Sequence, residues 1–141
     1  MSTTIDKRKR SQHQPTGSWI RRERRLAIYL RDRFTCLYCL RDLHGASPQD
    51  VTLDHVVCQS SDGHPDHSTA NLVTACRACN CARQDKPLAR FASPEARAHI
   101  RRNTSRKIMR YLKLAKSIIA GEVLRVANRE NYEFYEFKRA H

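Results

Sequence analysis

Apolar side chains recur every four residues near the start of the chain, at Leu26, Leu30 and Phe34. This spacing places them on one face of a helix, and Ser18 is a suitable N-cap residue before it. The pattern therefore predicts a helix over residues 18–34 with one packed face and one cationic face. The arginines expected on the cationic face are Arg21, Arg22, Arg24, Arg25 and Arg31.

The middle of the chain contains segments of different composition, each of which predicts a different kind of local structure. Cys36–Cys39 predicts a tight turn, and the β-branched run over Val51–Val56 predicts a short strand. Residues 59–69 are rich in Ser, Asp, Gly and Pro and indicate a loop. Residues 75–84 lack Gly and Pro, which favours a helix.

Two further helices are expected after Pro87. Ser93 followed by Pro94 and Glu95 is typical of a helix start, here of a short helix. A longer helix is predicted over about 104–120, with basic residues away from its apolar stripe and Gly121 ending or interrupting it. The stripe consists of Ile108, Tyr111, Leu112, Ala115 and Ile119. The aromatic residues of the last ten positions have no clear period and predict no element.

The length of 141 residues allows one compact domain with extensions. Residues 1–17 are polar and basic and cannot bury enough apolar surface to order themselves, so we expect a flexible arm. Its Lys7–Arg10 cluster also resembles a nuclear address, which is the weaker interpretation. We expect a domain over 18–90 and a helical extension over 91–141.

The charge points to a polyanionic partner. The chain has 27 Lys and Arg residues against 14 Asp and Glu, a formal net charge of +13, which attracts nucleic acid. A membrane surface is the weaker alternative, since no lipidation signal accompanies the basic helices. No apolar run of eighteen residues and no signal-peptide pattern is present, so we expect an intracellular, cytoplasmic protein.

Four of the six cysteines form two Cys-x-x-Cys pairs, Cys36 with Cys39 and Cys76 with Cys79. Intracellular thiols normally stay reduced, and four thiolates are the ligand set of closed structural zinc sites. One pair would suffice for redox chemistry, so two pairs favour a shared Zn²⁺ ion. Cys58 and Cys81 lie outside the pairs and are expected to be small buried hydrophobes.

Three polar residues fall in the segments that this zinc would join. Asp54 and the side-chain carbonyl of Asn80 offer hard oxygen ligands that suit Mg²⁺ or Mn²⁺, and His55 offers a base near neutral pH. Together they could hydrolyse a phosphodiester. Neighbours on a regular strand face opposite sides, so Asp54 and His55 need a twist or a strand end to share one site.

These motifs, together with Asn71-Leu72-Val73 and Arg83, resemble the zinc-containing HNH endonuclease family over about residues 28–88. The resemblance implies an α+β fold, a ββα-metal finger with a structural zinc held by four cysteines, and flanking basic helices. It also implies that His55 is the general base, that Asp54 and Asn80 bind the divalent ion, and that Asn71 braces the loop orienting His55. Relatives often have histidine at the position of Asn80, and an amide oxygen there should favour harder ions.

The remaining histidines, His44, His64, His67 and His99, are expected to be packing or surface residues. His64 and His67 have a spacing that allows a second metal site, but their polar loop supplies no partners. By resemblance Arg83 would contact a DNA phosphate, although many relatives have lysine there. Residues 97–116 hold eight basic residues and no acidic one, which favours a DNA-binding surface that includes Arg106, Arg110 and Lys113.

The sequence thus predicts a metal-dependent DNA endonuclease, similar to small phage or mobile-element proteins. A zinc-containing DNA-binding protein without catalysis is the main alternative, and a nuclease that cuts RNA is a third. Cleavage target, strand number and partners, whether a second copy or a phage packaging protein, are not readable from these residues.

Overall fold

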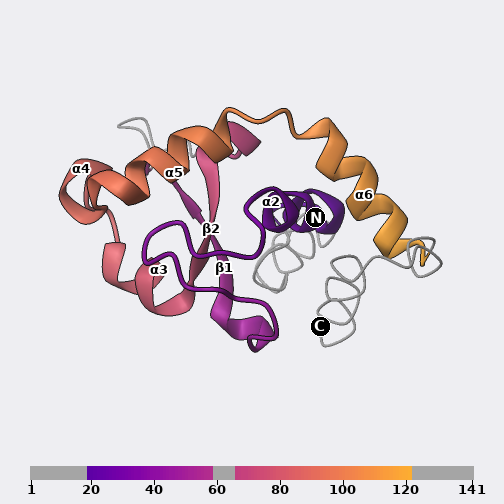
Figure 1. Ribbon diagram of the computed structural model, residues 1–141, viewed down its shortest axis with the longest axis horizontal. Coiled ribbons are helices and arrows are strands. Elements are labelled where there is room, and N and C mark those ends of the chain that lie inside the picture. Colours follow the sequence, from indigo (N-terminus) through magenta and orange to yellow (C-terminus); the bar gives the residue numbers. More distant parts are fainter. Residues whose placement is uncertain (1–18, 59–65, 122–141) are drawn as a thin grey trace, which may run out of the picture.

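The computed structural model describes residues 19–58 and 66–121. The predicted arm, Ser18, His64 and the aromatic tail lie outside this part of the chain. The fold is α+β, as predicted, with a two-stranded sheet among helices (Figure 1). In chain order the elements are α2 (Arg22–Arg31), η1 (Pro48–Asp50), β1 (Val51–His55), η2 (Thr69–Asn71), β2 (Leu72–Cys76), α3 (Arg77–Arg83), α4 (Leu88–Phe91), α5 (Pro94–Thr104) and α6 (Met109–Ile119).

The sheet consists of β1 and β2, which pair antiparallel and are followed directly by α3. Val51 lies opposite Cys76 at one end of the pair and His55 opposite Leu72 at the other. The predicted strand over Val51–Val56 is therefore confirmed almost to its ends. The predicted helix over 75–84 begins two residues late, at Arg77, because Ala75 and Cys76 complete β2.

Helix α2 is shorter than the prediction of 18–34. It begins at Arg22 after the N-cap residue Arg21, whose side chain forms no capping hydrogen bond. The chain leaves the helix at Arg33 and Phe34, which have positive φ angles of 55° and 50°. The predicted apolar face is confirmed, since Leu26, Leu30 and Phe34 are all buried.

Arg31 corrects the predicted cationic face, because it is buried and not solvated. Its guanidinium donates to the Asp32 carboxylate at 2.8 Å and to the carbonyls of Thr69 and Leu72 at 2.7 and 2.6 Å. Asp32 in turn accepts a hydrogen bond from the backbone N–H of Thr74 at 2.8 Å. Such pairing is what allows a charge to be buried, and it ties the end of α2 to β2.

Helix α5 begins as predicted. Pro94 is its first residue and the Ser93 hydroxyl accepts a hydrogen bond from the N–H of Ala96 at 3.1 Å. The predicted helix over 104–120 begins later, at Met109, because Thr104 still belongs to α5. At its other end Gly121 has a φ of +81° and donates to the carbonyl of Ile118, which ends α6 as an αL cap does.

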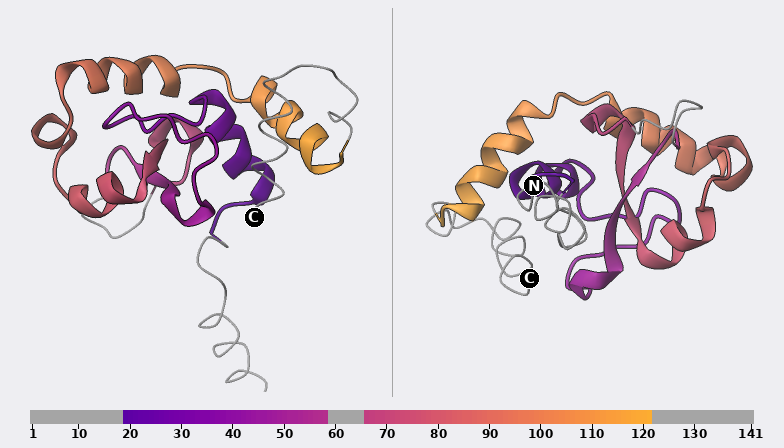
Figure 2. Two further views of the ribbon diagram at one scale, coloured as in Figure 1. Left: turned by 60° about the horizontal axis from the view of Figure 1, so that its bottom comes forward. Right: turned by 180° about the vertical axis from the view of Figure 1, so that it is seen from behind.

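The helices cover different sides of the sheet. In all three views of Figures 1 and 2, α2 lies between the strands and α6, while α5 and α4 lie on the side away from α6. The apolar face of α6 packs on the side of α2, with Ala115 and Ile118 fully buried. None of the described helices is long and apolar enough to cross a bilayer.

Candidate functional site

The two cysteine pairs meet in space, as predicted for a zinc site. The four Sγ atoms of Cys36, Cys39, Cys76 and Cys79 all lie within 4.8 Å of one another, and those of Cys39 and Cys76 are 4.0 Å apart. All four thiols are free. Tetrahedral zinc with Zn–S bonds of about 2.3 Å separates its sulfurs by about 3.8 Å, so the donor set fits Zn²⁺ without large movement.

The backbone explains why the sulfurs converge. The Sγ atoms of Cys36 and Cys76 accept hydrogen bonds from the N–H groups of Cys39 and Cys79, at 3.5 and 3.4 Å. The first turn closes at Leu40, which has a φ of +63° and donates to the carbonyl of Cys36. In the second turn, Cys76 is the N-cap residue of α3. Each pair thus presents two sulfurs on one side of a tight turn.

The two remaining cysteines lie outside this cluster. Cys81 is exposed, so its predicted burial is wrong. Cys58 is partly buried, and its Sγ donates to the carbonyl of Gln84 at 3.7 Å. Both are therefore available as control positions for tests of the zinc site.

Asp54 is held firmly at the end of β1. Its Oδ2 accepts a hydrogen bond from the Tyr38 hydroxyl at 2.5 Å and another from the Arg83 guanidinium at 3.0 Å. Burial and the adjacent Asp54 carboxylate raise the pKa of Tyr38, so its hydroxyl keeps its proton and donates it. Within the described residues no hydrogen bond is recorded to Oδ1 of Asp54, which leaves that oxygen for a cation.

Arg83 differs from the predicted phosphate contact, because its side chain is only 1% exposed. Besides Asp54 and Tyr38, its guanidinium binds the backbone carbonyls of His55, Val56 and Lys86. These bonds join α3 to the end of β1. The Arg83 guanidinium therefore braces Asp54 and the backbone at His55. Tyr38, its other partner, had no signal in the sequence that linked it to the site.

His55 points away from Asp54, as the alternation of a strand requires. Its Nε2 lies 2.9 Å from Nδ1 of His67, and both rings contact Trp19. Burial, followed by the nearby His67, lowers the pKa of His55, so the neutral base is favoured. His67 is thus not a plain surface residue. This contact could not be predicted from the sequence, because a histidine in a polar loop is not part of a periodic pattern that would indicate a contact.

Asn71 holds the two chain segments that flank this histidine pair. Its side chain accepts from the N–H of Val57 at 2.9 Å and donates to the carbonyls of Val57 and Asp66 at 3.1 and 2.9 Å. With only 7% exposure, it forms a buried bridge between the end of β1 and the residue before His67. The role that the resemblance implies for Asn71, bracing the loop that orients His55, stays a prediction.

Asn80 lies on α3 against the strand that carries Asp54. Its Nδ2 donates to Oγ1 of Thr52 at 2.9 Å and to the carbonyl of Leu53 at 3.2 Å. Both amide hydrogens are therefore used, and Oδ1 is the atom left to accept or to bind a cation. The structure thus fixes the rotation of the Asn80 amide in the way an oxygen ligand needs.

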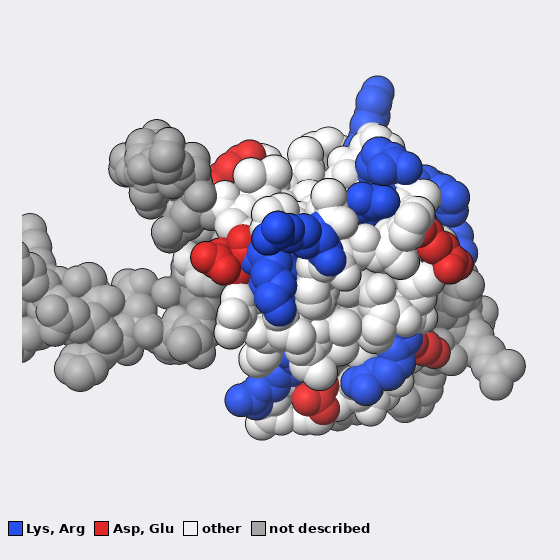
Figure 3. Space-filling model, turned by 90° about the vertical axis from the view of Figure 1, so that its left-hand side faces the viewer, with Lys and Arg blue, Asp and Glu red and all other residues white. Residues whose placement is uncertain are grey.

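The predicted DNA-contacting residues of the C-terminal helices lie at the surface. Arg110 and Lys113 are exposed on α6, and the Arg110 guanidinium lies 5.9 Å from the centre of the Tyr111 ring. Arg106 lies between α5 and α6 and is partly buried. On the face drawn in Figure 3, Lys and Arg side chains occupy several separate areas with acidic residues between them. Charge on this face is therefore spread out and not gathered into one stripe.

Comparison with known proteins agrees with this geometry. A family model described as HNH endonuclease matches residues 36–86, the segment that contains both cysteine pairs, Asp54, His55, Asn71 and Asn80. No curated protein and no solved structure matches the chain. The ββα arrangement and the four-cysteine cluster therefore agree with the match of residues 36–86 to the HNH endonuclease family model.

Proposed function

We propose that this protein is a metal-dependent DNA endonuclease that hydrolyses phosphodiester bonds. The observation that carries the proposal is the state of one side-chain oxygen in Asp54, the residue before His55 in β1, and of one in Asn80, which lies on α3 against that strand. The other polar atoms of Asp54 and Asn80 are fixed by protein hydrogen bonds, whereas Oδ1 of each remains for a ligand. A module that only binds DNA does not need this arrangement.

Asp54 and Asn80 would hold Mg²⁺ or Mn²⁺, since both supply hard oxygen donors. The bound ion would neutralise charge on the phosphate and stabilise the leaving oxygen. Arg83 and Tyr38 keep the Asp54 carboxylate in place through its other oxygen. Zinc at the cysteine cluster would have a separate, structural role, because the four cysteines would supply all four of its ligands.

His55 would accept the proton of the attacking water. Its Nε2 faces His67, so Nδ1 is the ring nitrogen left for the water. With the Nε2 proton donated to Nδ1 of His67, His55 presents an unprotonated Nδ1. His67 is then a positioning residue, which fixes both the orientation of the His55 ring and its tautomer.

The excess of positive charge would bind the DNA backbone without regard to sequence and in a salt-dependent manner. Exposed Arg110 and Lys113 are candidates for such contacts, as predicted from their sequence. One site cuts one strand, so a double-strand break would require a second copy of the chain or a second binding event.

Nicking of supercoiled plasmid tests this function. Wild-type protein with Mg²⁺ or Mn²⁺ should convert supercoiled DNA to open circles, and His55→Ala should be slower by roughly 10²–10⁴-fold. His44→Ala, a histidine outside the site, is the matched control and should nick as wild type does. Absence of nicking by the wild type, or equal nicking by His55→Ala, contradicts the proposal and favours a non-catalytic DNA-binding protein. Faster digestion of RNA in parallel reactions would instead indicate an RNA-cutting enzyme.

A further inference from the structure

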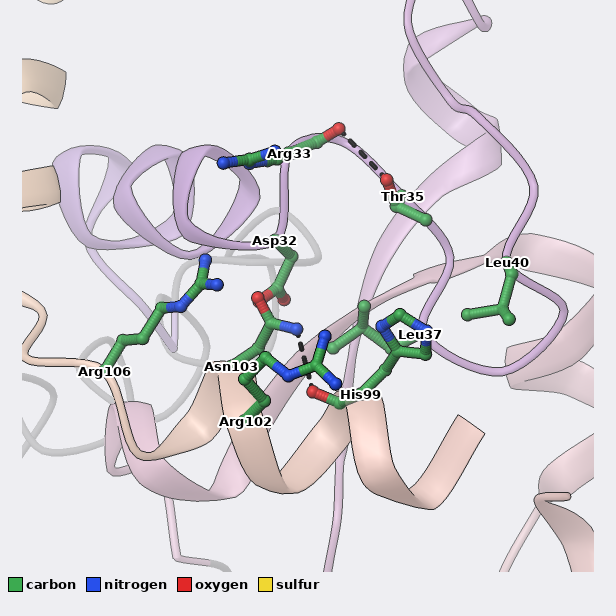
Figure 4. Close-up of a pocket in the computed structure, with 9 residues that line it drawn as sticks. All are labelled: Asp32, Arg33, Thr35, Leu37, Leu40, His99, Arg102, Asn103 and Arg106. Atoms are coloured by element: carbon green, nitrogen blue, oxygen red, sulfur yellow. Dashed lines mark hydrogen bonds between the residues drawn. The ribbon is translucent and has the colours of Figure 1, made fainter. Parts of the chain in front are cut away.

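A cavity lined by several basic side chains lies away from the candidate active site. It has a volume of about 310 Å³ and lies between the turn that follows α2 and the C-terminal half of α5. Figure 4 shows that the side chains around it come from both segments: Arg33 from the turn, and His99, Arg102 and Arg106 from α5 and the residues after it. Two parts of the chain separated by more than sixty residues thus build one cationic pocket.

The charge of this pocket is not balanced by the protein. Within the described residues, Arg33, Arg102 and Arg106 take part in no ion pair with Asp or Glu, and Asp32 is the one acidic side chain among the lining residues. The Asp32 carboxylate is already bound by the Arg31 guanidinium and by the N–H of Thr74. The negative charge of Asp32 is therefore already neutralised by Arg31, and it does not compensate the three arginines at the cavity.

The pocket is built on fixed backbone. Arg33 follows α2 in the left-handed region, and its neighbour Phe34 is fully buried, so the turn is anchored in the core. Opposite it, Asn103 is 8% exposed and donates from Nδ2 to the carbonyl of His99 at 2.8 Å. Basic residues in the last turn of α5 also stabilise the negative end of that helix. This effect accounts for Arg101 and Arg102 but not for Arg33, which belongs to another element.

The position of the pocket separates it from the cleavage site. β1, which carries Asp54 and His55, pairs with one edge of β2. The pocket lies along the other edge, where the N–H of Leu37 donates to the carbonyl of Thr74 and the Asp32 carboxylate accepts from the N–H of Thr74. A group bound there is therefore not the phosphate whose hydrolysis Asp54 and His55 would assist.

We propose that this pocket binds one backbone phosphate of duplex DNA, distinct from the phosphate that is cleaved. The inference rests on the proposed function, which supplies DNA as the polyanion. Guanidinium groups suit this role because each presents several N–H donors in a planar fork that matches phosphate oxygens. Arg33 and Arg102 line this cavity from different elements, so a phosphate held by both would fix where the strand lies relative to the active site.

Equilibrium binding to a labelled duplex, measured by fluorescence anisotropy over a range of salt concentrations with zinc retained and without Mg²⁺ or Mn²⁺, tests the proposal. The double variant Arg33→Gln/Arg102→Gln should bind roughly tenfold more weakly near 0.1 M salt. Its plot of log K against log salt should be less steep by about 1, the loss of one phosphate contact. The control is Arg101→Gln, which removes an exposed arginine from the same helix but not from the pocket, and it should keep most of the wild-type affinity and slope.

An equal loss of affinity and slope in Arg101→Gln would overturn the proposal, because it would mean diffuse attraction and not a built pocket. Unchanged binding by the double variant, with folding verified by circular dichroism and zinc content, would overturn it as well. Inorganic phosphate, titrated while the Asn103 side-chain amide is followed by NMR, separates the two sources of phosphate. If it shifts this signal while the double variant still binds DNA as the wild type does, the pocket takes free phosphate and not DNA. Failure of wild-type protein to bind or nick DNA would instead contradict the proposed function itself.

Discussion

The two ends of the short sheet are held by different means. At one end, Val51 faces Cys76 and the chain enters the four-cysteine cluster; at the other, His55 faces Leu72 beside His67. Four residue steps, about 13 Å, separate these ends. Sulfur atoms converge at the first end, whereas side-chain hydrogen bonds from Asn71 and Arg83 hold the second. Under the proposed function, the first end would stabilise the domain and the second would place the reacting groups.

This difference indicates how the domain can remain small. A metal ion bound at one end contributes folding free energy that a limited apolar core does not supply. The other end can then keep polar atoms such as Oδ1 of Asp54 for a ligand without loss of the fold. If the two ends have these separate roles, changes at each should affect different measurements.

Loss of a zinc ligand should have the largest effect. Cys76→Ser should unfold the domain, because structural zinc contributes on the order of 10 kcal/mol and small domains have net stabilities of about 5–15 kcal/mol. Circular dichroism and zinc content measure this directly. Cys81→Ser, the control at an exposed cysteine, should keep both zinc and fold. A folded, zinc-free Cys76→Ser protein would show that this end does not depend on the metal.

Arg83→Met should reduce both the stability of the domain and the nicking rate. The losses should be smaller than those caused by removal of a zinc ligand but larger than those caused by any surface substitution. It leaves the Asp54 carboxylate without its guanidinium partner, which costs about 3 kcal/mol in buried pairs, and it also releases the carbonyls of His55 and Val56. Denaturant unfolding and nicking rates measure the two consequences. Arg77→Met, on the exposed face of the same helix, is the control. An Arg83→Met protein as stable as Arg77→Met but weaker in DNA binding would restore the phosphate-contact interpretation.

His67→Ala should act at the catalytic end alone. Because a misplaced base can cost up to about 100-fold in rate, we expect kcat for nicking to fall about tenfold while KM and the melting temperature change little. His67→Asn should recover most of this loss, since its side-chain oxygen can accept from Nε2 of His55. Equal rates for the alanine and asparagine variants would show that His67 only fills space.

The smallest expected effect is a displacement of the pH profile. His55 acts as a base when neutral, so activity should fall as the pH drops through its pKa. Burial and His67 lower that pKa, so the midpoint should lie below the ordinary value of about 6.5. Initial nicking rates between pH 5 and 8, with zinc content followed in parallel, measure it. In His67→Asn the midpoint should move up, towards the ordinary value; a midpoint above 6.5 in the wild type would contradict the assignment.

Some features were readable from the sequence because they depend on local order or on a recurring spacing. The two Cys-x-x-Cys pairs predicted a common cluster, the β-branched run predicted β1, and Ser93 with Pro94 predicted the start of α5. Each of these signals lies within a few neighbouring residues, and the structure confirms all three. The assignment of Asp54, His55 and Asn80 to catalysis also came from sequence and stays a prediction until cleavage is measured.

Other features were decided by tertiary structure alone. Arg31 and Arg83 were expected at the surface or on DNA, yet both are buried, with partners that include residues 29 to 45 positions away. His67 lies beside His55, and Arg33 and Arg102 line one cavity, for the same reason. The local sequence pattern does not indicate the role of an arginine or a histidine, because that role depends on which acceptors or anions surround the side chain. The sequence alone determined the four cysteines that cluster and the approximate place of several elements. Only the fold determined which arginines are buried and which lie at the surface, because burial depends on acceptors that are distant in the sequence.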